Sequence, residues 1–158
     1  MLKGFFSQKK EIELVAPIQG ELIPIDKVKD TMFSQKILGE GFAMVPNEKI
    51  VTVVSPITGK INNVFPTKHA IGLIGPRNME ILYHFGLDTV SLKGKGIQCH
   101  ISEGQKIKKG EKMLTIDLSE YEAAGIDVVN MLVFTNEVDV SEILEKLEYR
   151  KYQRGEAL

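Results

Sequence analysis

Short apolar runs separated by turn-forming residues recur along the chain. Residues 12–16, 21–25, 42–46, 49–54 and 127–134 are rich in Ile, Leu, Val, Met or Phe, and Pro, Gly, Asn or Asp stands at or near the end of each. Runs of this length bounded by turns are typical of β-strands. The pattern predicts an all-β domain, an antiparallel β-sandwich or barrel of short strands.

Helical signals are weaker and lie between or after these runs. The polar segments 26–36 and 118–125 are expected to hold a helical turn or a loop, and Asp139 with Glu142 predicts a capping box that opens a short helix ending at Leu147. The fold class is therefore all-β with minor helical turns.

The two ends of the chain differ in character from the middle. Residues 1–10 are predicted to be a loose tail, with association of this apolar and basic segment with a membrane surface as the alternative. Residues 148–158 are charged and are expected to fray as a basic C-terminal tail. The predicted domain spans residues 11–147.

Two segments indicate a weak internal repeat. APIQGEL at residues 16–22 and SPITGKI at residues 55–61 share Pro-Ile-x-Gly, and EGQKIKKGEKML at residues 103–114 places a short strand between two glycines. Repeated strand units of this kind occur in barrel-like sandwiches.

A predicted β-hairpin carries two of the three histidines. The runs 69–74 and 79–85 flank the turn sequence Gly-Pro-Arg-Asn, and a loop with an even number of residues places His69 opposite His84. Opposed residues share a face, with Cβ atoms about 4.5–5.5 Å apart. The sequence therefore predicts two imidazoles in contact, whereas a three-residue loop would break this register.

Paired imidazoles suit either a nucleophile with a helper or a metal site. Catalytic zinc normally takes three protein ligands, and structural zinc takes four. His100 lies in a charged stretch and is expected to be solvated, while the neighbouring Cys99 would point to the other face of a strand. The pair favours imidazole nucleophile chemistry without a required metal, and His69 and His84 could bind zinc only with a ligand from a partner.

Composition narrows the class of protein. The chain has 158 residues, 43% hydrophobic and 26% charged, with a net charge of -1, which suits one domain and gives no indication of nucleic-acid binding. A single cysteine excludes an intrachain disulfide, and no apolar run approaches the roughly 20 residues that span a bilayer. Without the features of a signal peptide, we expect a cytoplasmic protein.

Ordered motifs extend this interpretation. APIQG, VKDTMFSQKILGEGFAMVP, SPITGKI and TKHA are followed by HFGLDTVSLKGKG at residues 84–96. Over about residues 11–136 the chain resembles the glucose-family enzyme IIA component of the bacterial phosphoenolpyruvate-dependent sugar phosphotransferase system. The resemblance implies an antiparallel sandwich known as a duplicated hybrid motif and a phosphocarrier function without a cofactor.

The resemblance also implies residue roles. His84 would accept a phosphoryl group through Nε2 from the phosphohistidine of the phosphocarrier HPr and pass it to a cysteine of a sugar-specific enzyme IIB domain. His69 would hydrogen-bond the phosphoryl oxygens, and Thr67 would orient His69. The Gly86 carbonyl would accept the Nδ1 proton of His84 and so fix its tautomer.

A docking surface is implied around these residues. The protein would contact the membrane only through the permease that carries the enzyme IIB domain. The apolar members of the surface would be Phe33, Ile37, Leu38, Phe65, Leu82 and Val90, with Asp30 and Asp88 as acidic residues that meet basic groups of HPr. Beyond Asn136 the chain departs from the family, because a short helix and the basic tail stand where a final strand is usual.

Other interpretations stay open at this point. A regulator with the same phosphorylated His84 would bind transporters or metabolic enzymes according to its phosphorylation state. A biotin- or lipoyl-carrier module would need an acceptor lysine at a tight hairpin, a setting that Lys106, Lys108 and Lys109 lack. A zinc peptidase would need a third ligand.

Overall fold

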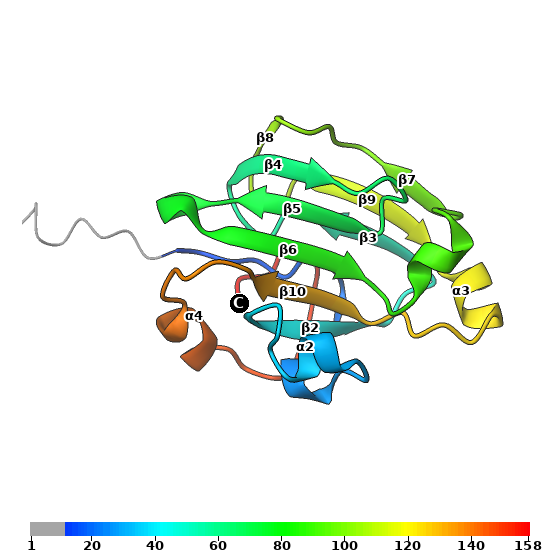
Figure 1. Ribbon diagram of the computed structural model, residues 1–158, viewed down its shortest axis with the longest axis horizontal. Helices are drawn as coiled ribbons and strands as arrows, with labels where there is room; N and C mark the ends of the chain where they lie inside the picture. The colour runs from blue at the N-terminus through cyan, green and yellow to red at the C-terminus, as the bar shows by residue number, and fades with distance from the viewer. Residues whose placement is uncertain (1–11) are drawn as a thin grey trace, which may run out of the picture.

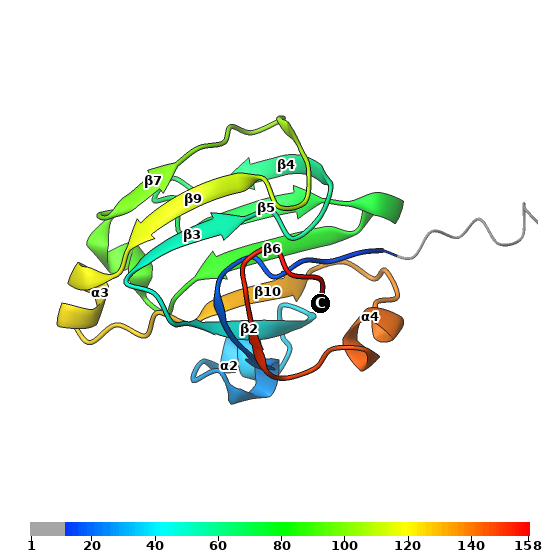
Figure 2. The same cartoon turned by 180° about the vertical axis from the view of Figure 1, so that it is seen from behind.

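The computed structural model describes residues 12–158, which form two antiparallel sheets packed against each other (Figure 1). The three-stranded sheet lies behind the larger one in Figure 1 and in front of it in Figure 2. The larger sheet has the order β11 (Lys151–Tyr152), β1 (Gly20–Pro24), β2 (Glu40–Pro46), β10 (Asn130–Phe134), β6 (Glu80–Phe85), β5 (Ala70–Ile74), β4 (Gly59–Val64) and β8 (Lys106–Ile107). The smaller sheet has the order β3 (Ile50–Val54), β9 (Lys112–Asp117) and β7 (Ile97–Cys99).

Helical segments are short, as the sequence predicts. They are α2 (Thr31–Ser34), α3 (Ser119–Ala123) and α4 (Ser141–Glu145), with the 3₁₀ turns η1 (Ile25–Lys27), η2 (Pro76–Asn78) and η3 (Thr89–Leu92). Asp139 accepts hydrogen bonds from the backbone and hydroxyl of Ser141, the first residue of α4. The N-cap is Val140 and has no side-chain cap, so the predicted capping box of Asp139 with Glu142 is wrong. The prediction of an all-β fold with minor helical turns is confirmed.

Strand β6 shows how the main core is built. Its inward residues Ile81, Tyr83 and Phe85 are fully buried between the two sheets, while Leu82 and His84 alternate onto the outer face of the larger sheet. This is the two-residue period of a strand with one face on a core. Because the alternation is fixed by the three buried side chains, His84 is held on the outer face.

A second, smaller core lies on that outer face. Side chains from the segment that contains η1 and α2 cover the larger sheet over β2 and β10, where Figure 1 shows α2. Its buried members are Ile25, Val28, Phe33, Ala43, Val129, Met131 and Val133. Met131 on β10 is the register partner of His84 on β6, so His84 stands at the border of this cluster.

The histidine hairpin has a different register from the predicted one. Ile74 pairs with Glu80, and His84 lies opposite Ala70 instead of His69. The turn contains the three residues of η2, two of which, Arg77 and Asn78, have positive φ angles. A loop with an odd number of residues shifts the pairing by one position, which is the case that breaks the predicted register.

The C-terminal segment is ordered, so the expectation that residues 148–158 fray is wrong. Tyr152 pairs with Gly20 across β11 and β1, and Ala157 bridges to Val15. Tyr152 belongs to the main core, and its hydroxyl donates to the Glu148 carbonyl. A short final strand therefore closes the edge of β1, whose backbone groups would otherwise lack partners.

The expected loose tail of residues 1–10 lies outside the described residues. Within residues 12–158 no helix is long and apolar enough to span a bilayer.

Replacing Tyr152 with Ala tests the ordered C-terminal segment. We expect the free energy of unfolding to fall by about 3 kcal/mol, because the ring is 3% exposed and its loss leaves a cavity. Tyr149→Ala is the matched control, since Tyr149 is 53% exposed and should change stability little. Urea unfolding measures both, and equal effects of the two variants would contradict the observed packing.

Candidate functional site

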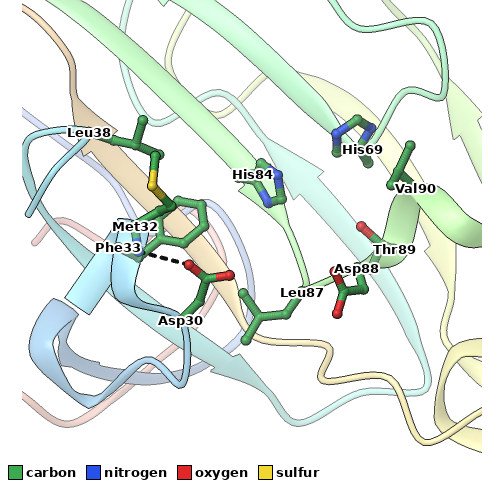
Figure 3. Close-up of a pocket in the computed structure, with 10 residues that line it drawn as sticks. All are labelled: Asp30, Met32, Phe33, Leu38, His69, His84, Leu87, Asp88, Thr89 and Val90. Atoms are coloured by element: carbon green, nitrogen blue, oxygen red, sulfur yellow. Dashed lines mark hydrogen bonds between the residues drawn. The ribbon is translucent and has the colours of Figure 1, made fainter. Parts of the chain in front are cut away.

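The two histidines of the hairpin lie side by side on the outer face of the larger sheet. Their ring centroids are 5.0 Å apart and the ring planes meet at 82°, an edge-to-face arrangement. Both rings border a cavity of about 270 Å³ (Figure 3). The residues that line it are Asp30, Met32, Phe33, Leu38, His69, His84, Leu87, Asp88, Thr89 and Val90.

His69 reaches this position although it does not oppose His84 in the ladder. It lies just before β5, in a bend in which Lys68 has a φ angle of 62°. The backbone there departs from strand geometry, so strand alternation no longer decides where the side chain points. The Thr67 hydroxyl is hydrogen-bonded to Nδ1 of His69, and the Phe65 ring packs edge-on against the imidazole with centroids 5.6 Å apart.

The His84 ring is more closely surrounded than the His69 ring. Phe33 from α2 contacts its ring with centroids 5.2 Å apart and planes at 60°. Nδ1 of His84 is buried and has no partner with hydrogen-bonding geometry among the described residues. Because Nδ1 is the enclosed nitrogen, Nε2 is the one left to face the cavity.

The turn after His84 depends on Gly86. Its φ angle is +66°, and a Cβ atom there would collide with the Thr89 side chain and with the Asp127 carbonyl. The Thr89 hydroxyl donates to the Phe85 carbonyl at 2.5 Å, and the Gly86 amide donates to the Val129 carbonyl at 2.7 Å. Glycine therefore allows the chain to turn tightly under the imidazole.

Some of the remaining predicted residues line the cavity and others do not: Asp30, Phe33, Leu38, Asp88 and Val90 line it, whereas Ile37, Phe65 and Leu82 do not. Ile37 and Val90 are 59% and 51% exposed, Asp88 is also exposed, and Leu38, Phe65, Leu82 and Asp30 are partly buried. Phe33 is only 5% exposed and belongs to the second core, and it also lines the cavity.

Three lining residues were not predicted from the sequence: Met32, Leu87 and Thr89. Leu87 and Thr89 fall inside the HFGLDTVSLKGKG motif, which was the available signal for them. Met32 is 44% exposed and adjoins the buried Phe33, a contrast that becomes visible only once the course of α2 is known.

No third metal ligand joins the histidine pair. Residues 12–158 contain no group of three His, Cys, Asp or Glu side chains placed to hold a metal ion. His100 is instead exposed, and its Nε2 is hydrogen-bonded to the Thr115 hydroxyl at 2.8 Å.

Comparison with known proteins decides the family. The family model described as "phosphoenolpyruvate-dependent sugar phosphotransferase system, EIIA 1" matches residues 12–140. The chain belongs to this family. EIIA proteins are phosphotransferase components of sugar uptake, so the predicted class is confirmed, and the family implies contact with HPr and with EIIB domains.

Relatives and a solved structure agree with this assignment. The chain is 40% identical over 147 residues to the "PTS system glucose-specific EIIA component" of Oceanobacillus iheyensis, an alignment that covers 90% of this chain and 88% of that protein. It is 42% identical over 124 residues to the "PTS system glucose-specific EIICBA component" of Streptococcus pneumoniae, covering 78% of this chain but only 17% of that protein. The glucose permease IIA structure from Mycoplasma capricolum superposes with a TM-score of 0.86 at 33% identity and 95% coverage of each chain.

The electrostatics of this EIIA site favour neutral imidazoles. Burial, followed by the nearby His69, lowers the pKa of His84 to about 4, while the Gly86 backbone and the Asp30 carboxylate act in the opposite direction. Burial also lowers the pKa of His69. Removing water destabilises the charged form of a histidine, so both rings are neutral at pH 7.

Titration should show the shifted pKa of His84 directly. The unfolded chain binds a proton on His84 below about pH 6.5, whereas the folded protein does so only near pH 4. Stability therefore falls as the pH drops through this window, by roughly 2–3 kcal/mol between pH 7 and pH 4.5 from this residue. NMR of the imidazole carbons gives the pKa, and urea unfolding gives the stability.

His84→Gln is the control for that measurement. It removes the titrating group, so the loss of stability between pH 7 and pH 4.5 should be smaller than in the unmodified protein by that amount. Identical pH profiles, or an NMR pKa near 6.5, would contradict the burial of His84.

Proposed function

We propose that His84 is the phosphorylated residue of this EIIA protein. Its Nε2 attacks the phosphorus of the HPr phosphohistidine, the bond from phosphorus to the HPr nitrogen breaks, and the phosphoryl group later moves to a cysteine of an EIIB domain. The observation that carries the proposal is a neutral, partly buried imidazole that borders an open cavity beside a second imidazole.

The protonation state suits this attack. A neutral imidazole with its free electron pair on the attacking nitrogen is a competent nucleophile at pH 7. The proton of His84 would reside on the enclosed Nδ1. The Gly86 backbone, which raises the pKa of His84, would become its acceptor after a small rotation of the ring, because Nδ1 makes no hydrogen bond in the present orientation. Phosphoryl transfer then needs in-line placement and compensation of charge more than it needs acid or base catalysis.

His69 supplies the compensation of charge in this proposal. When the Thr67 hydroxyl donates to Nδ1 of His69, the ring proton resides on Nε2. That N–H can then donate to an oxygen of the phosphoryl group on His84, whose ring is 5.0 Å away between centroids. Donors placed before the reaction at the position where charge collects lower the barrier for transfer.

The exposed surface around the cavity supplies the docking site. The apolar residues Ile37, Leu38, Phe65, Leu82 and Val90 would contact HPr and EIIB in turn, and Asp30 and Asp88 would meet basic groups. An apolar collar with a polar rim is typical of a transient interface. The fused relative supports a permease partner, which would place the protein at the cytoplasmic face of the membrane. The names of the relatives make glucose the first sugar to test.

Phosphorylation in a reconstituted system tests the role of His84. Incubation with phosphoenolpyruvate, enzyme I and HPr should add one acid-labile phosphate, seen as a mass increase of the intact protein. His84→Gln should abolish the increase, whereas His100→Gln should leave it unchanged. Full labelling of the His84→Gln variant would refute the assignment.

A separate experiment tests His69. The His69→Gln variant should still accept phosphate from HPr, but its transfer to an EIIB domain should slow by about 10²–10³-fold, the usual cost of losing one preorganised donor. Rapid-quench kinetics with phosphorylated protein and EIIB separates the two steps. Equal slowing of acceptance and donation would argue against a role specific to onward transfer.

A further inference from the structure

Phe33 is buried, whereas other apolar residues near it in the sequence are exposed. Its ring is 5% exposed and lies against His84, whereas Met32 beside it is 44% exposed and Ile37 after the helix is 59% exposed. Figure 3 shows the Phe33 ring beside His84, with Met32 overlapping it in this view and Asp30 nearby. One short helix therefore presents one residue to solvent and another to the reactive imidazole.

Buried side chains of the larger sheet and of the segment before α2 hold the Phe33 ring in place. It belongs to the second core together with Val28, Ala43 and Met131, among others, and Met131 is the register partner of His84. A side chain packed on several fixed neighbours cannot change rotamer without opening a cavity. The position of the Phe33 ring is thus set by the sheet that also carries His84.

Asp30 fixes α2 at its start. The Asp30 side chain accepts from the Met32 amide at 2.9 Å, and its carbonyl accepts from the Phe33 and Ser34 amides at 3.1 and 2.8 Å. These are the backbone donors that a helix start would otherwise leave unpaired. The same Asp30 borders the cavity, so the cap is part of the wall around His84.

Phe33 and His69 both contact the His84 ring. Phe33 meets it at 60° and His69 at 82°, with centroids 5.2 and 5.0 Å away. Two aromatic contacts of this kind limit rotation about the bond that carries the imidazole and exclude water from the ring.

We propose that Phe33 is a positioning residue for phosphoryl transfer: it holds the His84 ring dry and in the orientation that turns Nε2 to the cavity, and it does not dock the partner. This inference rests on the proposed role of His84. It also separates Phe33 from the exposed residues of the collar, such as Ile37 and Val90, which contact the partner protein.

The two roles differ in their kinetic consequences. A docking residue contributes binding energy alike before and during transfer, so its loss raises KM for phosphorylated HPr. A positioning residue changes the fraction of collisions in which Nε2 is aligned with phosphorus, so its loss lowers kcat and leaves KM almost unchanged.

The experiment compares Phe33→Leu and Phe33→Ala with Met32→Ala, a truncation on the same helix and in the same cavity wall. In Phe33→Ala we expect the NMR pKa of His84 to rise from about 4 toward 6.5, and kcat for acceptance from phosphorylated HPr to fall about tenfold or more at constant KM. Phe33→Leu should give smaller changes of the same kind. Met32→Ala should leave the pKa of His84 unchanged and raise KM.

The results distinguish a positioning role of Phe33 from a docking role. A rise in KM for Phe33→Ala with unchanged kcat and unchanged His84 pKa would overturn the proposal in favour of docking, and a shifted pKa with unchanged kcat would overturn the positioning role. Loss of NMR dispersion in Phe33→Ala leaves Phe33→Leu as the test. The titration needs no phosphorylation, so failure of the proposed function, seen as phosphate retained by His84→Gln, is distinguishable from failure of this inference.

Discussion

The site depends on an imidazole kept partly out of water on the outer face of a sheet. A histidine in that position would ordinarily be solvated and would titrate near pH 6.5. Here the second core extends up to His84, so the ring is covered by Phe33 while the cavity beside it stays open. The same arrangement restrains the proposed nucleophile and keeps it uncharged, and both properties follow from packing.

The sandwich makes this arrangement possible by separating two tasks. The core that stabilises the fold lies between the sheets, where β6 contributes Ile81, Tyr83 and Phe85. The proposed phosphoryl-transfer site lies on the opposite face of the same strand. Side chains that alternate along one strand are rigidly linked, so the buried residues position His84 without taking part in the chemistry. The short segment that contains α2 then adds local cover where the sheet alone would leave the imidazole bare.

Much of the fold could be predicted from sequence because it is encoded locally. Strand periodicity, the glycine and proline punctuation and the HFGLDTVSLKGKG motif give an all-β fold and a histidine pair. The predicted register of the histidine hairpin is wrong because the register depends on whether Arg77 and Asn78 both adopt positive φ angles. Residue types alone do not settle this. The contact of His69 with His84 persists because the bend at Lys68 compensates for the shift of one residue.

The positions of the C-terminal segment and of Phe33 are decided by tertiary contacts that no local pattern contains. The charged residues after Leu147 read as a tail, yet Tyr152 completes the core and β11 pairs with β1. Phe33 reads as one more apolar residue in a surface patch, yet the backbone of α2 turns it onto the sheet. In both cases an aromatic ring in a polar segment is buried, because the area it removes from water outweighs the polarity of its neighbours. Tyr149, three residues before Tyr152, stays 53% exposed, so burial depends on the tertiary contacts available at each position and not on the residue type alone.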